Sequence, residues 1–450
     1  MSRRTPALAS LFTCFLSAAL AQSGAPQAFK FTPVDAKLLE EVNELDRQLE
    51  KKGLVYQDPE LTAYLNNVAT RMLGDQPAPE QVNFKFRVLR DPMVNAFAMP
   101  NGSIYVHTGL LATLENEAQL ASVLAHEITH VTQRHTYQHN RSLRKKMVAM
   151  HVFSAVSAAG GFFPAGSLFG AVLSVAGSVS QVLVAASVFG YSQDLERAAD
   201  RNGVDLMTKG NYDARAMPRT FALLDEKLEI EPVETFWRTH PKLQERITTT
   251  TQLAGSQGLK EPRAVSEDAY LALVAGAMRY NIGADLVSRR ARTALARANR
   301  LVRWKPDDPA NRVLLADAYR ALGAKTAEPG QEEQSRHGQA DHRKRLLKLT
   351  AEEEQKELLK KPDGAVERKA NAERAEKEYL ESIAKDSSFA EAHRGLGMLY
   401  EEQSRNADAA REYKRYLDLA PADALDRLRI ERRLEKLEKS LVDRGPAKPA

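Results

Sequence analysis

The segment His126-Glu127-Ile128-Thr129-His130 restricts what this chain can fold into more than any other part of it. Histidines four residues apart project from the same face of a helix, one turn apart, so both imidazoles can reach one ion. Apolar residues at Leu120, Val123, Leu124, Ile128 and Val131 predict that this helix is buried. Burying the charged Glu127 carboxylate costs free energy unless a metal or another partner compensates its charge. The fold must therefore bury a helix that directs two imidazoles and a carboxylate toward one region.

Zinc is the ion that suits this pattern, because it accepts histidine nitrogen and carboxylate oxygen at about 2.0–2.2 Å. We expect one zinc ion per chain. A catalytic zinc site needs a third protein ligand, and Glu196 is the best donor. Asp200 lies one turn further along the same predicted helix, where it can orient a ligating histidine. The alternative for this segment is a solvated acidic face paired with Arg197 and Arg201.

Upstream of the motif, the hydrophobic spacing predicts helices. Apolar residues repeat at helical spacing over residues 35–52. A second helix is bounded by Asp58, a suitable N-cap, and by Gly74 after its last turn. Asn116 then begins the helix that contains the two histidines.

The spacing changes to that of strands between these helices. Residues 84–88 alternate apolar and charged side chains, and residues 94–99 and 103–107 flank a Pro-Asn-Gly turn. This pattern predicts a small antiparallel sheet. The expected fold class is therefore α+β and predominantly α.

Residues 1–21 have the pattern of a secretion signal, with a basic start, an apolar stretch and a small-x-small site that predicts cleavage near Ala21. The only cysteine, Cys14, falls inside it, so the mature chain would contain no thiol, as suits an oxidising compartment. Residues 22–34 are expected to be a linker. The formal net charge of +5 is too small an excess to indicate a nucleic-acid partner.

Residues 147–190 contain no Asp, Glu, Lys or Arg and several glycines. Residues 168–190 are long enough to span a bilayer, but they are rich in Ser, Gly and Ala and have no flanking aromatic belt. We favour a flexible, partly buried loop and helix near the active site over a membrane span, and contact with a membrane stays an open alternative.

The second half of the chain is helical and repetitive. One copy of the spacing that is typical of a tetratricopeptide repeat is present near the C-terminus. Its positions are Leu396-Gly397, Tyr400, Ala409, Tyr413 and Pro421. We predict an α-solenoid of such repeats over residues 264–443, with a charged insertion at about 323–370 and a tail at 444–450. The insertion is either a solvated helix or disordered, and the alternative for the whole region is an ordinary helical bundle.

The motif His126-Glu127-x-x-His130, followed by Glu196-x-x-x-Asp200, resembles the HExxH gluzincin metallopeptidases, the family of the heat-shock protease HtpX and the CAAX-prenyl protease. Two upstream segments add to the resemblance, Asn95-Ala96-Phe97-Ala98 and Thr108-Gly109-Leu110. The motifs cover roughly residues 35–255, and the remainder is similar only in architecture to exported members with repeats. The resemblance implies a zincin-like metallopeptidase domain over residues 35–255.

The resemblance also implies roles for residues. Zinc would be bound by His126, His130 and Glu196, with Glu127 as the general base. The strand edge at Asn95, Ala96 and Phe97 would lie beside the cleft, where a substrate can add as a further strand. His240, in Thr239-His240-Pro241, resembles a removable fourth zinc ligand. We interpret four other histidines as surface or core residues: His107, His135, His139 and His151.

These expectations describe a periplasmic zinc metalloendopeptidase of envelope quality control. It would cleave misfolded or stalled polypeptides, outer-membrane proteins among them, and the repeats would dock a partner such as the outer-membrane assembly machinery. One alternative is a non-proteolytic chaperone or adaptor with a structural zinc domain, against which the intact Glu127 argues. Another is a membrane-anchored protease that uses residues 168–190.

Overall fold

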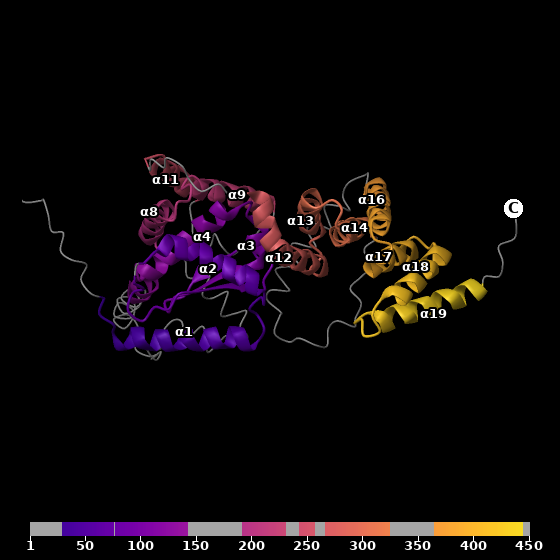
Figure 1. Cartoon of the computed structure of the whole chain (residues 1–450), viewed down its shortest axis with the longest axis horizontal. Coiled ribbons are helices and arrows are strands. Elements are labelled where there is room, and N and C mark those ends of the chain that lie inside the picture. The colour runs from indigo at the N-terminus through magenta and orange to yellow at the C-terminus, as the bar shows by residue number, and fades with distance from the viewer. Residues whose placement is uncertain are drawn as a thin grey trace, which may run out of the picture.

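The computed structural model describes residues 29–75, 77–142, 191–230, 243–256, 266–324 and 364–443. Helices dominate these residues, and one small sheet lies near the N-terminal end of the molecule (Figure 1). The named helices are α1 (Pro33–Lys51), α2 (Pro59–Leu73), α3 (Thr108–Thr113), α4 (Glu117–Thr132), α8 (Gln193–Lys209), α9 (Ala216–Ile230), α11 (Leu243–Ser256), α12 (Glu267–Val287), α13 (Ala291–Trp304), α14 (Pro309–Gly323), α16 (Gly364–Lys385), α17 (Ala390–Glu402), α18 (Asn406–Leu419) and α19 (Arg427–Asp443).

The N-terminal ends of α2 and α4 are fixed by the caps that the sequence predicts. The Asp58 side chain accepts a hydrogen bond from the N–H of Leu61 at 2.9 Å, and the Asn116 side chain accepts one from Gln119 at 3.1 Å. These bonds satisfy backbone donors that have no partner inside the helix. A local interaction therefore sets the start of α4, the metal-motif helix that carries His126 and His130, ten residues before His126.

The sheet has three strands in the order β1-β3-β2, namely β1 (Lys85–Leu89), β2 (Ala96–Ala98) and β3 (Ser103–His107). The turn at 100–102 joins β2 and β3 as an antiparallel pair, as predicted. The prediction of an antiparallel sheet is wrong for β1, which pairs parallel to β3. After β1 the chain crosses to the far edge, forms β2 and returns as the central strand, so β1 and β3 run in the same direction.

The two faces of the sheet are covered by different helices. Ile104 and Val106 face the core that α2 and α4 share, whereas Tyr105 and Phe97 face α1. This split follows from the alternation of side chains along a strand. Figure 1 shows α1 on one side of the sheet and α2 and α4 on the other. The metal-motif helix thus lies directly on the sheet, against β2 and β3.

Helix α12 attaches the C-terminal helices to this core. Its Asn281 is fully buried, accepts a hydrogen bond from the Thr108 hydroxyl at 2.8 Å and donates one to the Thr108 carbonyl at 2.6 Å. The hydroxyl of Tyr270 also donates to the carbonyl of Leu111 at 2.8 Å. The hydrophobic core around α4 continues through α12 into α13 and α14.

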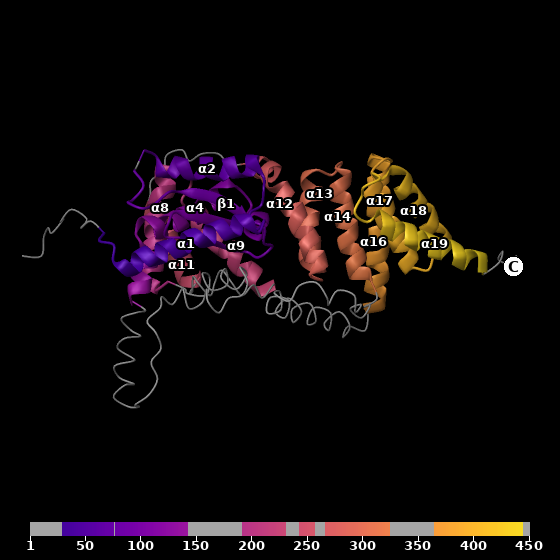
Figure 2. The same cartoon turned by 90° about the horizontal axis from the view of Figure 1, so that it is seen from below.

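From α12 to α19 the helices stand side by side in a row (Figure 2). Helix α14 packs on α16, and helix α17 packs on α18. A side chain at Gly397 would lie 2.6 Å from Cδ1 of Tyr413, so a glycine is needed for the close approach of α17 and α18. Within the described residues, no helix is both long enough and apolar enough to cross a bilayer.

Several predicted features lie outside the described residues. They are the signal segment 1–21, the linker up to residue 28, the uncharged stretch from 147 to 190, most of the charged insertion, the tail 444–450, His151 and His240.

Candidate metal centre

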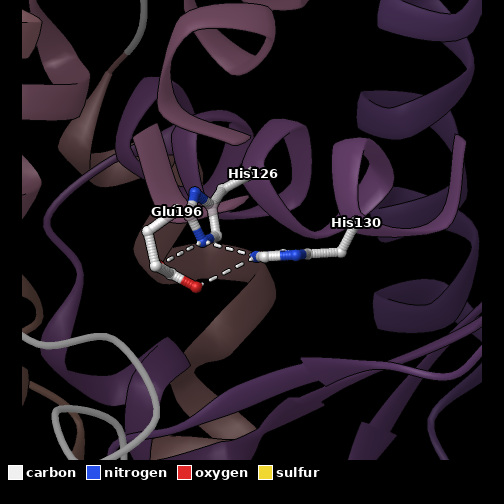
Figure 3. A group of neighbouring side chains, drawn as sticks. All are labelled: His126, His130 and Glu196. Carbon is white, nitrogen blue, oxygen red and sulfur yellow. Dashed lines mark hydrogen bonds and ion pairs between the residues drawn. The ribbon is translucent and has the colours of Figure 1, made fainter. Parts of the chain in front are cut away.

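Helices α4 and α8 bring together three side chains that can ligate a metal: His126, His130 and Glu196. The Nε2 atoms of His126 and His130 are 3.0 Å apart. The Glu196 carboxylate oxygens lie 3.5 Å from Nε2 of His126 and 3.6 Å from Nε2 of His130. Figure 3 shows both rings and the carboxylate directed toward one point. All three side chains are buried.

The donor set fits zinc. Two ligands about 2.1 Å from an ion in tetrahedral geometry lie about 3.4 Å apart. The three observed separations range from 3.0 to 3.6 Å. Two imidazoles and one carboxylate are also the ligand set of catalytic zinc sites that keep a position open. His126, His130 and Glu196 would therefore hold zinc.

Helix α8 reaches the motif because of a glycine. A side chain at Gly203 would lie 2.8 Å from Cε of Met217 and 3.4 Å from the backbone nitrogen of His126. Gly203 therefore allows α8 to lie against α4 and α9, two turns beyond Glu196. This close approach places a carboxylate from residue 196 beside a histidine from residue 126.

Glu127 lies between the two histidines in the sequence and is 1 % exposed. Its charge acts on two neighbours of the centre. Burial raises the pKa of Tyr191, and the charges of Glu127 and Glu196 add to that shift. Burial lowers the pKa of Arg246, but the charges of Asp200, Glu196 and Glu127 outweigh it and raise that pKa. A carboxylate so close to the ligands can accept a proton from a water molecule there.

Behind His126 lies a buried ion pair. Asp200 Oδ1 lies 3.0 Å from Nδ1 of His126, so Asp200 can accept the proton of the nitrogen that faces away from Glu196. Arg246, from α11, donates to both Asp200 oxygens, from Nε at 2.8 Å and from a terminal nitrogen at 2.7 Å. Its guanidinium also lies over the ring of Phe221, 4.1 Å from the centroid. Such partners fix the tautomer and the orientation of a ligating histidine.

The charges and hydrogen bonds around this ion pair shift the pKa values of His126 and Asp200. Burial and the Arg246 charge lower the pKa of His126, but its hydrogen bonds to Asp200 and Glu196 outweigh them and raise it to about 9. Burial raises the pKa of Asp200, yet Arg246 and His126 lower it below its usual value. Without metal, the His126 ring is therefore protonated on both nitrogens at neutral pH, and zinc binding would release the proton of the nitrogen that faces the ion.

The sequence interpretation missed two residues beside His130. His135 places Nδ1 3.0 Å from Nδ1 of His130, and burial lowers the pKa of His135 to about 4. The Tyr191 ring stacks on the His130 ring, with centroids 4.0 Å apart, and the Tyr191 hydroxyl is 2.9 Å from the Thr136 hydroxyl. His135 is buried, in agreement with its interpretation as a surface or core histidine, but that interpretation did not include its contact with His130. Helical periodicity could not reveal this, since α4 ends at Thr132.

The predicted substrate edge lies on β2. Ala96 and Phe97 belong to this strand, at the edge of the sheet, and Asn95 precedes it. The Phe97 ring stacks on Tyr105, 5.4 Å between centroids. The Asn95 side-chain oxygen is buried and has no hydrogen-bond partner among the described residues. His107 contacts the edge of the Phe97 ring.

Comparison with known proteins agrees with this geometry. Residues 57–254 match the model of peptidase family M48. A putative beta-barrel assembly-enhancing protease of Vibrio cholerae is 34% identical over 217 residues, which are 46% of this chain and 42% of that protein. The beta-barrel assembly-enhancing protease of Escherichia coli is 30% identical over 246 residues, 53% of this chain and 47% of that protein.

More distantly, the mitochondrial metalloendopeptidase OMA1 of Schizosaccharomyces pombe is 28% identical over 188 residues, 41% of this chain and 51% of that protein. The chain thus spans about half the length of the curated relatives it matches. The matched region contains both helices of the metal centre and the ion pair behind it. Residues 57–254 are therefore similar to the peptidase domain of family M48.

Proposed function

We propose that this protein is an exported zinc metalloendopeptidase of envelope quality control. The observation that carries the proposal is the convergence of His126, His130 and Glu196 beside the buried Glu127, inside a region that matches peptidase family M48. Three protein ligands leave one position of a tetrahedral ion open, as in catalytic sites. A purely structural site has no need of a neighbouring base.

When bound, zinc would supply Lewis-acid polarisation of the scissile carbonyl and of the attacking water. Glu127 would take the proton of that water and pass it to the leaving amine. Asp200, held by Arg246, would keep His126 in the tautomer whose Nε2 faces the ion. The catalytic proton transfers therefore belong to Glu127, whereas Asp200 acts through His126.

The substrate would be an extended polypeptide that adds to the free edge of β2. Strand β2 pairs with β3 on one side, and no other described strand covers its second side. It packs against α4, which carries the ligands. The buried Asn95 oxygen, at the start of this edge, would accept a hydrogen bond from the substrate backbone.

Two of the relatives are named for beta-barrel assembly, and this supports misfolded or stalled envelope proteins as substrates. We place the peptidase domain over residues 35–255 and a repeat region over 264–443. The paired helices α14/α16 and α17/α18 would dock a substrate or a protein partner. Contacts from α12 to Thr108 and Leu111 join this region to the helix that precedes α4.

The test compares purified residues 22–450 with the Glu127→Gln variant, measuring casein cleavage and zinc content. Glu127→Gln should retain near-stoichiometric zinc and lose most hydrolysis, because the ligands survive and the proton acceptor does not. Glu117→Gln changes the other glutamate of α4 and serves as the matched control, with cleavage close to wild type. Undiminished cleavage by Glu127→Gln would exclude the proposed mechanism.

A further inference from the structure

The ring nitrogen of His130 that faces away from the donor group meets a second histidine. Nε2 of His130 lies beside His126 and Glu196, so Nδ1 is its remote nitrogen. That Nδ1 lies 3.0 Å from Nδ1 of His135, whose side chain is 2 % exposed. Two imidazole nitrogens at this distance form a hydrogen bond in which one donates and the other accepts.

A sharp turn after α4 makes this contact. Arg134 adopts φ of 59°, in the left-handed region, and its N–H donates to the carbonyl of Val131 at 3.0 Å. In an unbroken helix, a side chain five residues after His130 would point about 140° away around the axis. The turn instead brings His135 back toward the His130 ring.

Side-chain contacts hold the turn in this unfavourable conformation. The Arg134 guanidinium lies over the rings of Phe29 and Phe31, 5.3 and 5.2 Å from their centroids. It also donates a hydrogen bond to the carbonyl of Glu80. Two separate segments, at residues 29–31 and at Glu80, therefore fix the residue that precedes His135.

We infer that His135 is a positioning residue for the metal ligand His130. It accepts the Nδ1–H hydrogen bond of His130 and so keeps the Nε2 lone pair directed at the ion. Neutral imidazole carries a proton on one nitrogen alone, so an acceptor at Nδ1 selects the tautomer that can ligate through Nε2. This inference rests on the zinc site of the proposed function but not on the peptidase reaction.

The two ligating histidines are thus oriented by different chemistry. His126 is oriented by the Asp200 carboxylate, which Arg246 neutralises. His130 is oriented by an imidazole, which brings no formal charge of its own when it is neutral. The Tyr191 ring covers one face of the His130 ring at 4.0 Å, so the ring is held both by stacking and at its remote nitrogen.

Zinc affinity of His135 variants tests the inference. Purified residues 22–450 are stripped with a chelator, and zinc binding is measured by competition with a chromophoric chelator. His135→Leu removes the acceptor and leaves a buried N–H of His130 unsatisfied, so zinc affinity should fall by about 10–100-fold. His135→Asn places a carbonyl oxygen where the histidine Nδ1 was, so it should retain most of the affinity.

His139→Leu is the matched control, since it makes the same substitution four residues later, at the edge of the Tyr191 ring. Its zinc affinity should stay near wild type. The visible spectrum of the cobalt-substituted protein gives a second readout, because it reports ligand geometry and should change in His135→Leu alone. A role in packing alone would lower the Tm of the metal-free protein without changing this spectrum.

Unchanged zinc affinity in His135→Leu would overturn the inference, and so would an equal loss in His135→Leu and His135→Asn. These outcomes are separable from failure of the proposed function. If Glu127→Gln cleaves casein normally, the peptidase mechanism fails, whereas the order of zinc affinities among the His135 variants stays as stated here.

Discussion

Removing Arg246 should expose how much the metal centre depends on one buried cation. The Arg246 side chain is 4 % exposed and forms two hydrogen bonds with Asp200, at 2.7 and 2.8 Å. Arg246→Met keeps an unbranched apolar side chain, but it removes the guanidinium that pairs with Asp200 and lies over the Phe221 ring. The variant therefore tests the ion pair rather than the volume of the side chain.

The expected magnitude follows from the burial of both partners. Breaking a buried ion pair by removing one partner costs about 3–5 kcal/mol, because the remaining charge is uncompensated. His126 still donates to Asp200 at 3.0 Å. We therefore expect the lower end of the range, about 3 kcal/mol, in the free energy of unfolding of the metal-free protein.

The loss should depend on pH in a defined direction. In the wild type the pKa of Asp200 is lowered, so its contribution to stability is present above its unfolded pKa and disappears as pH falls through the folded pKa. Without Arg246, burial raises that pKa, and Asp200 takes up a proton in acid. The penalty of Arg246→Met should therefore be larger at about pH 7 than at about pH 5.

Urea unfolding of chelator-treated protein, followed by near-ultraviolet circular dichroism at both pH values, measures this penalty. Arg197→Met is the control, because Arg197 pairs with Asp194 and Glu245 on the surface of the same helices. It should change stability far less. A loss below about 1 kcal/mol for Arg246→Met, or the same loss at both pH values, would refute this account of the ion pair.

Two further predictions concern the ligands and the repeats. Glu196→Gln should weaken zinc binding more than Asp200→Asn, for which a loss of about 10–100-fold is expected, and metal analysis decides between them. Normal zinc content in Glu196→Gln would mean that another carboxylate is the ligand. Gly397→Ala places a methyl group 2.6 Å from Tyr413 and should destabilise the C-terminal helices by about 1–3 kcal/mol in thermal unfolding. Gly283→Ala, which meets no atom within 4 Å, is its control and should be neutral or stabilising.

Features that depend on neighbours along the chain could be predicted from the sequence alone. Asp58 and Asn116 cap the helices they were expected to cap, because an N-cap bonds to a backbone N–H three residues away. The alternation around Phe86 and Val88 identified the strand and its buried face. The spacing of His126 and His130 put both on one side of α4, since helix geometry alone sets that relation.

Other contacts between segments distant in the sequence depend on tertiary packing and could not be predicted. The parallel pairing of β1 with β3 depends on the path between the strands, which residue alternation does not record. The contact of His135 with His130 depends on a left-handed Arg134, held by Phe29 and Phe31 from the start of the chain.

The ion pair of Arg246 with Asp200 likewise joins α11 to α8, 46 residues apart, in a buried environment that only packing creates. Local preferences fix which residues form helices and which of their faces are apolar. Polar side chains that packing buries and brings close together then form hydrogen bonds and ion pairs with one another. These interactions, rather than the HExxH pattern alone, determine how the metal ligands are oriented.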